Sequence, residues 1–111
     1  MLKLMLDMRP DHLKILQALL KKHVPDIAVW AFGSRVFANQ KKLAKKYSDL
    51  DLCIVSETPL SMKILSDLNA DCSESDLPYK VDIIDWASAS ASFKKTINEK
   101  KLLLPSISSN E

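Results

Sequence analysis

The chain has 111 residues, of which 47% are hydrophobic, so it has the length of one domain and enough apolar side chains to build a core. Its 16 basic and 14 acidic residues leave a net charge of +2, which falls short of the basic excess that binding to nucleic acid usually needs. The composition therefore implies no polynucleotide partner.

The cysteines and the lengths of the apolar stretches indicate the cellular compartment in which the protein is expected. Cys53 and Cys72 have no pairing framework, no CxxC motif and no metal-ligand spacing, so we expect free thiols in a reducing compartment. The apolar stretch at residues 1–6 is interrupted by Asp7, and no apolar run is long enough to span a bilayer. We therefore expect a cytoplasmic protein that does not contact a membrane.

The first predicted elements are a helix and a strand. Apolar residues recur at helical spacing from Leu13 to Leu20, which predicts a helix over residues 11–23 with Asp11 as its cap and Pro25 as its stop. The continuous apolar run at residues 27–32 predicts a buried strand. It is closed by Gly33-Ser34, a tight turn that holds the only glycine in the chain.

Residues 39–47 are rich in lysine, and we interpret them as a solvated loop. Residues 49–55 then alternate, so that Asp49 and Asp51 lie on one face of a second strand and the leucines on the other. A second helix is expected from Thr58, as its cap, to near Ala70.

A third strand at residues 80–86 and a last helix at residues 93–100 complete the predicted domain, which spans residues 1–104. Residues 105–111 are expected to be a disordered tail. A short link joins the first two strands, and a helical crossover leads to the third, so the pattern predicts an α/β (α+β) fold with a small mixed sheet flanked by helices.

Three carboxylates could carry chemistry. Asp49 and Asp51 project side by side, and such a pair is unfavourable unless a cation such as Mg²⁺ lies between them; the alternative is a solvated strand edge. Asp82 adds a third carboxylate from another strand, whereas alternation places Asp85 on the other face, where it would end the strand or act as a cap.

Two further features have both a structural and a functional interpretation. The turn at Gly33-Ser34 could offer backbone N–H groups and a hydroxyl to a phosphate, although such turns are common. Trp30 and Trp86 could stack on a base, but their positions in and at the end of strands favour core packing.

Taken together and in this order, residues 32–35 (Phe-Gly-Ser-Arg), 48–52 (Ser-Asp-Leu-Asp-Leu) and 81–85 (Val-Asp-Ile-Ile-Asp) resemble the minimal nucleotidyltransferase family of the DNA polymerase beta-like superfamily. The chain departs from the usual family pattern in having no second glycine at residues 36–38 and a longer segment at residues 39–47.

The resemblance implies the polymerase beta-like nucleotidyltransferase fold and transfer of AMP from ATP. It implies that the catalytic residues hold two Mg²⁺ ions: Asp49, Asp51 and Asp82. It implies a nucleotide-binding set as well: Gly33, Ser34, Arg35 and Ser48.

The resemblance also implies a partner. In the family that the sequence resembles, short chains pair with a helical HEPN-domain protein, often as the antitoxin of a toxin–antitoxin system that adenylylates a tyrosine on the toxin, and by analogy the same is expected here. Two alternatives stay open: a module that neutralises the helical partner by occlusion, and a small-molecule nucleotidyltransferase that completes its pocket as a homo-oligomer or with a partner.

Overall fold

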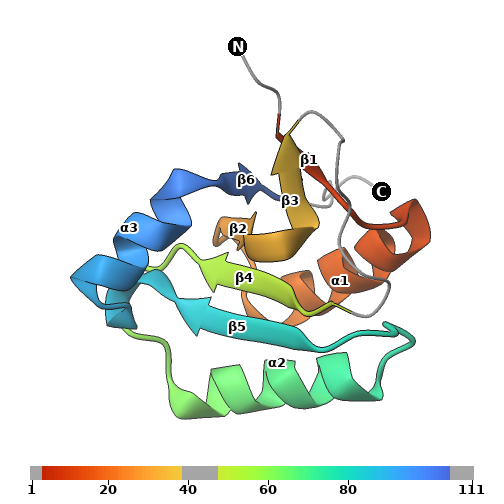
Figure 1. Cartoon of the computed structure of the whole chain (residues 1–111). Coiled ribbons are helices and arrows are strands. Elements are labelled where there is room, and N and C mark those ends of the chain that lie inside the picture. Colours follow the sequence, from red (N-terminus) through yellow and green to blue (C-terminus); the bar gives the residue numbers. More distant parts are fainter. Residues whose placement is uncertain (1–3, 39–47, 106–111) are drawn as a thin grey trace.

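A four-stranded mixed sheet carries the fold in this computed structural model, which describes residues 4–38 and 48–105 (Figure 1). The strands are β1 (Leu4–Leu6), β2 (Val29–Phe32), β3 (Val36–Ala38), β4 (Leu50–Ile54), β5 (Val81–Asp85) and β6 (Lys101–Leu103). The helices are α1 (Pro10–His23), α2 (Met62–Glu74) and α3 (Ala91–Glu99), with single turns of 3-10 helix at Gly33–Arg35 and Trp86–Ser88.

The strand order in the main sheet is β5-β4-β2-β6. β2 is antiparallel to both β4 and β6, whereas β4 and β5 are parallel. Parallel neighbours need a crossover connection, and α2 supplies it. The predicted mixed sheet, with its helical crossover between the second and third predicted strands, is confirmed.

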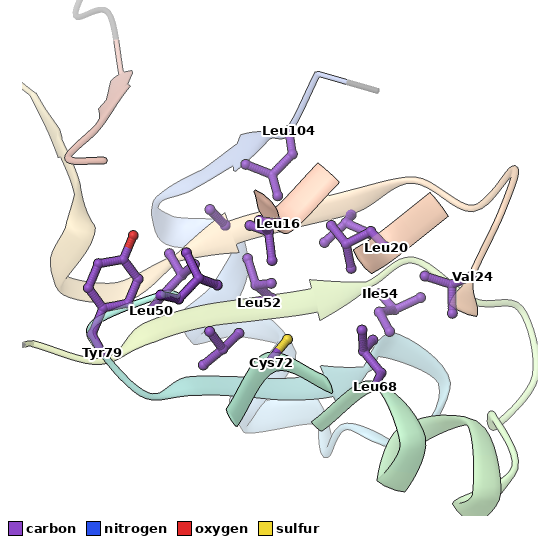
Figure 2. Close-up of a cluster of buried hydrophobic side chains, with 14 of the residues drawn as sticks. Leu16, Leu20, Val24, Leu50, Leu52, Ile54, Leu68, Cys72, Tyr79 and Leu104 are labelled. Atoms are coloured by element: carbon purple, nitrogen blue, oxygen red, sulfur yellow. The ribbon is translucent and has the colours of Figure 1, made fainter. Parts of the chain in front are cut away.

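The two faces of the sheet are covered by different helices. Leu50, Leu52 and Ile54 are fully buried in the main core, which α1 and α2 complete with residues such as Leu16 and Leu68 (Figure 2). On the opposite face of the sheet, α3 contributes Ile97 to a smaller cluster that includes Phe32 and Cys53. Period-two alternation along β4 therefore separates an apolar face from a face that carries Asp51.

The starts of two helices differ from the prediction. The N-cap of α1 is Arg9, and Asp11 lies in the first turn, where its carboxylate pairs with the Arg9 guanidinium at 3.0 Å. The N-cap of α2 is Ser61 rather than Thr58, because the Ser61 hydroxyl accepts a hydrogen bond from the Ile64 N–H at 3.1 Å. α2 also runs past the predicted end near Ala70, to Glu74.

Three strands were not predicted. β1, β3 and β6 have 3 residues each, too few to show an alternation pattern. β1 pairs with β3 in a separate antiparallel sheet, with Leu6 opposite Val36, and β6 extends the main sheet along β2. The lysine-rich segment and all of the expected tail except Pro105 lie outside the described residues.

Both cysteines are free thiols, as predicted, and both are buried. Burial raises the pKa of each to about 11, because a thiolate is poorly solvated there. No helix in residues 4–38 and 48–105 has the length and apolar character needed to cross a membrane.

The capping difference is testable. Ser61→Ala should lower the free energy of unfolding by about 1 kcal/mol, since it removes the acceptor for the Ile64 N–H. The matched control is Thr58→Ala, which removes an exposed hydroxyl that precedes the helix and should change stability little. Urea unfolding followed by circular dichroism measures both; a larger loss for Thr58→Ala would contradict the assignment of the cap.

Candidate active site

Two carboxylates face each other across the parallel pair of central strands. Asp51 on β4 and Asp82 on β5 are register partners. Because the side chains of Leu50 and Leu52 point into the main core, the side chain of Asp51 projects from the opposite face of the sheet. Asp49 is exposed and lies just before the first residue of β4. The structure therefore brings together the three aspartates that the sequence singled out.

The carboxylates of Asp51, Asp82 and Asp49 are near enough to affect one another electrostatically. Burial raises the pKa of the Asp51 carboxyl above its ordinary value, and the negative charges of Asp82 and then Asp49 raise it further. The folded chain thus disfavours the ionised form of Asp51. A positive charge placed among the three groups would relieve that penalty.

Lys80 is a neighbour of the site that the sequence analysis did not single out. Its ammonium lies 3.3 Å from Asp82 Oδ1; the Lys80 side chain is 72% exposed and that of Asp82 is 42% exposed. The sequence contains the spacing that predicts this contact, because residues i and i+2 of a strand share a face and Lys80 precedes Asp82 by two residues. An exposed pair of this kind adds little to stability, so Lys80 is best described as a cation at the rim of the carboxylates.

Gly33 lies directly against Asp51. Its φ of 80° falls in the left-handed region, and a Cβ on this residue would overlap Asp51 Oδ2. Only glycine therefore permits both this turn and its close approach to the carboxylate. Ser34, the next residue, is exposed, so its hydroxyl is accessible beside the glycine turn.

Arg35 is directed into the fold. The side chain is 5% exposed, its Nε donates to the Ser48 carbonyl and its Nη1 donates to the Asp7 carbonyl, both at 2.9 Å. Its guanidinium carbon lies 3.9 Å from the centre of the Tyr79 ring. The contacts described for Arg35 and Ser48 are with the protein itself, and phosphate binding by either residue stays a prediction.

Asp85 ends β5, as predicted. It is buried on the face opposite Asp82, where its Oδ2 accepts hydrogen bonds from the Leu60 N–H at 3.1 Å and the Ser88 hydroxyl at 2.8 Å. These contacts tie the loop before α2 to the end of β5. Asp85 is thus a structural carboxylate, at the other end of the strand from the site.

The tryptophans pack against each other, in line with the core interpretation. Trp30 and Trp86 meet edge to face with ring centres 5.2 Å apart, and the Lys101 ammonium lies 3.7 Å from the centre of the Trp30 ring. Both rings are half-buried beside the cluster under α3.

A family comparison agrees with this arrangement. Residues 14–109 match the family described as "Polymerase beta, Nucleotidyltransferase". The match covers most of the chain and includes the glycine turn and the three aspartates. The chain belongs to this nucleotidyltransferase family. The resemblance noted from the sequence motifs and the fold that it implied are confirmed.

Individual relatives of this nucleotidyltransferase are informative. A probable protein adenylyltransferase, MntA, from Haemophilus influenzae is 49% identical over 94 residues, which cover 85% of this chain and 79% of that protein. A chain in the crystal structure of a toxin–antitoxin with AMP-PNP has a TM-score of 0.65 and 20% identity, with 88% of this chain and 76% of that chain covered.

A further structural relative comes from the complex of a tri-AMPylated HEPN toxin from Shewanella oneidensis with MNT antitoxin. Its TM-score is 0.60 and its identity 19%, with 86% of this chain and 73% of that chain covered. At these identities, the likeness to the solved structures concerns the fold.

The donor set of the nucleotidyltransferase suits Mg²⁺ in type. Asp49, Asp51 and Asp82 supply the hard oxygen atoms that this ion prefers, and the absence of a Cβ at Gly33 lets the Asp51 carboxylate lie against the turn. However, within residues 4–38 and 48–105 no three acidic, histidine or cysteine side chains converge on one point. The aspartates are near enough to interact electrostatically, and Asp82 is paired with Lys80. The donor atoms therefore fit Mg²⁺ in chemistry, while the three side chains do not form a ready-made ligand cluster in this conformation.

The contact between Gly33 and Asp51 predicts a coupled pair of substitutions. Gly33→Ala should lower the free energy of unfolding by about 2–4 kcal/mol, the sum of backbone strain at positive φ and the overlap with Asp51. In an Asp51→Ala background the overlap is gone, and the same change should cost about 1–2 kcal/mol. Urea unfolding of the four proteins without divalent cations measures the coupling. Equal costs in the two backgrounds would contradict the contact.

Proposed function

We propose that the protein is a Mg²⁺-dependent protein adenylyltransferase, which transfers AMP from ATP to a hydroxyl group of a helical HEPN-like partner and acts as the antitoxin of that pair. The observation that carries the proposal is the in-register pair of Asp51 and Asp82 beside the Gly33 turn. The 49% identity to a protein named as a probable adenylyltransferase supports the choice of reaction.

The three aspartates are assigned to the metal. Asp49, directly before β4, Asp51 on β4 and Asp82 on β5 would hold the metal through their carboxylate oxygens. When bound, two Mg²⁺ ions supply charge stabilisation at the attacking and leaving oxygens and lower the pKa of the attacking hydroxyl. Burial and the negative charges of Asp82 and Asp49, which raise the pKa of Asp51, disfavour a third carboxylate charge there, and a bound cation would offset that repulsion.

The glycine turn is assigned to the triphosphate. With no side chain at Gly33, the backbone N–H groups of the turn can approach phosphate oxygens closely, and the exposed Ser34 hydroxyl can donate to them. Because the turn lies against Asp51, phosphates bound at the turn would lie beside the metal that the carboxylates are proposed to hold, without rearrangement of the backbone. Ser48, directly before Asp49, is assigned to the same nucleotide.

The acceptor is assigned to a second protein. One relative with the same fold was solved as MNT antitoxin in complex with a tri-AMPylated HEPN toxin, and another with AMP-PNP. We therefore propose that a HEPN-like partner supplies the hydroxyl group, with a tyrosine as the expected residue.

Modification of the partner is the direct test of the function. Incubation of the protein with its HEPN-like partner, ATP and Mg²⁺ should add the mass of one or more AMP groups to the partner, measured by intact-protein mass spectrometry. The control is the double variant Asp49→Asn/Asp51→Asn, which keeps the apolar face of β4 and should add none. A stable complex in which ATP is bound and the partner stays unmodified would overturn the enzymatic proposal in favour of occlusion.

A comparison of Asp82 and Asp85 separates catalysis from structure. Asp82→Ala should lower the transfer rate by a factor of about 100 or more, because a metal ligand is lost. Asp85→Ala should instead lower the free energy of unfolding by about 1–3 kcal/mol, since it leaves the Leu60 N–H without its acceptor. The rate of AMP transfer and the urea midpoint are measured for both. The reverse ranking would show that the assignment of the two carboxylates is wrong.

A further inference from the structure

We infer that Arg35 is a positioning residue, which holds the leading ends of β4 and β5 in place and thereby sets where Asp49, Asp51 and Asp82 lie relative to one another. The inference rests on the proposed function for the identity of the site. It differs from the expectation that Arg35 contacts the phosphates directly.

One guanidinium group contacts three separate stretches of the chain. Nε donates to the carbonyl of Ser48, the residue before Asp49, and Nη1 donates to the carbonyl of Asp7, both at 2.9 Å. The flat face of the group lies 3.9 Å from the centre of the Tyr79 ring, three residues before Asp82. The carbonyl of Arg35 in turn accepts from the Asp7 N–H at 2.6 Å.

Asp49 depends on this arrangement more than Asp51 does. The ladder between β4 and β5 begins with the Leu50 N–H, which donates to the Lys80 carbonyl at 2.9 Å, so Asp49 lies outside it. Within the part of the chain that the structure describes, the hydrogen bond from Arg35 to Ser48 is what holds the backbone on the N-terminal side of Asp49. Loss of that bond would remove a restraint on the backbone directly before Asp49.

The ring contact provides the corresponding restraint for β5. Tyr79 is 9% exposed, and its hydroxyl is buried without a hydrogen-bond partner among the described residues, so the ring itself makes the useful contact. A cation over an aromatic face is attracted to it, the more so when both are shielded from water. Because Tyr79 directly precedes Lys80 and Val81, the ring fixes the start of the strand that carries Asp82.

Burial explains why arginine is needed here. A buried cation is costly unless its polar groups have partners, so the guanidinium favours the geometry in which Nε and Nη1 donate to the two carbonyls and its flat face lies over Tyr79. Lysine cannot reproduce the fork of donors or the flat face. Arg35→Lys therefore keeps the charge while removing the positioning.

The test measures metal binding without nucleotide or turnover. Mn²⁺ binding is followed by the free-ion electron paramagnetic resonance signal in wild type, Arg35→Lys, Tyr79→Leu and Tyr79→Phe. Positioning predicts that Arg35→Lys and Tyr79→Leu raise the dissociation constant for Mn²⁺ by about tenfold, as loss of a supporting residue around a metal site does. Tyr79→Phe keeps the ring and should match wild type. Leu20→Ala, which removes a core side chain of α1 without changing Arg35 or Tyr79, controls for general destabilisation and should match as well.

The alternatives give different results. If Arg35→Lys binds Mn²⁺ as wild type does while its affinity for ATP falls, Arg35 is a phosphate ligand and the inference is overturned. If Arg35→Lys does not fold, Tyr79→Leu decides: a folded variant with the Mn²⁺ affinity of wild type overturns it. A third result is that wild type binds Mn²⁺ and Arg35→Lys binds it more weakly, but wild type does not modify the partner. In that case the proposed function fails and the inference stands. No Mn²⁺ binding in wild type overturns both.

Discussion

The register between β4 and β5 is the constraint on which the rest of the site depends. Pairing Asp51 with Asp82 fixes two like charges on neighbouring strands, at the separation of adjacent backbones. A shift of one residue in either strand would turn one carboxylate into the apolar core and bring an aliphatic side chain to the surface. The leucines and isoleucine of β4, fully buried under α1 and α2, oppose any such shift. The apolar face of the sheet therefore determines the electrostatics of the other face.

The cost of this arrangement is visible at Asp51, whose carboxyl has a raised pKa because of burial and its two acidic neighbours. The repulsion among these carboxylates lowers the free energy of unfolding, and burial of the large core beneath the sheet offsets this loss. Gly33 belongs to the same compromise, since a glycine in the left-handed region is entropically expensive but lets the turn approach the carboxylate. Both features are typical of a site shaped by a ligand rather than by folding alone.

Sequence patterns predicted the parts of the fold that have strong periodicity. The alternation in residues 49–55 located β4 and its acidic face, and the helical spacing of leucines located α1, because burial imposes these periods on long elements. β1 and β3 were not predicted, because each has only 3 residues and they pair with each other across a long separation in sequence. Thr58-Pro59 was mistaken for a cap, since Ser61 offers the same chemistry three residues later and only the hydrogen bond to Ile64 distinguishes them. The contacts of Arg35 were equally invisible, because they depend on carbonyls and a ring from three separate segments.

The buried thiols have a practical consequence for the study of complexes. Maleimides and similar reagents attack the thiolate, and Cys53 and Cys72 are buried with pKa values of about 11, so neither offers a reactive group near neutral pH. A single cysteine introduced at Met62, which is 84% exposed at the start of α2, would then be the site of labelling without removal of the native ones. A fluorophore attached there would label the chain for binding measurements while the core and the carboxylate face keep their natural residues.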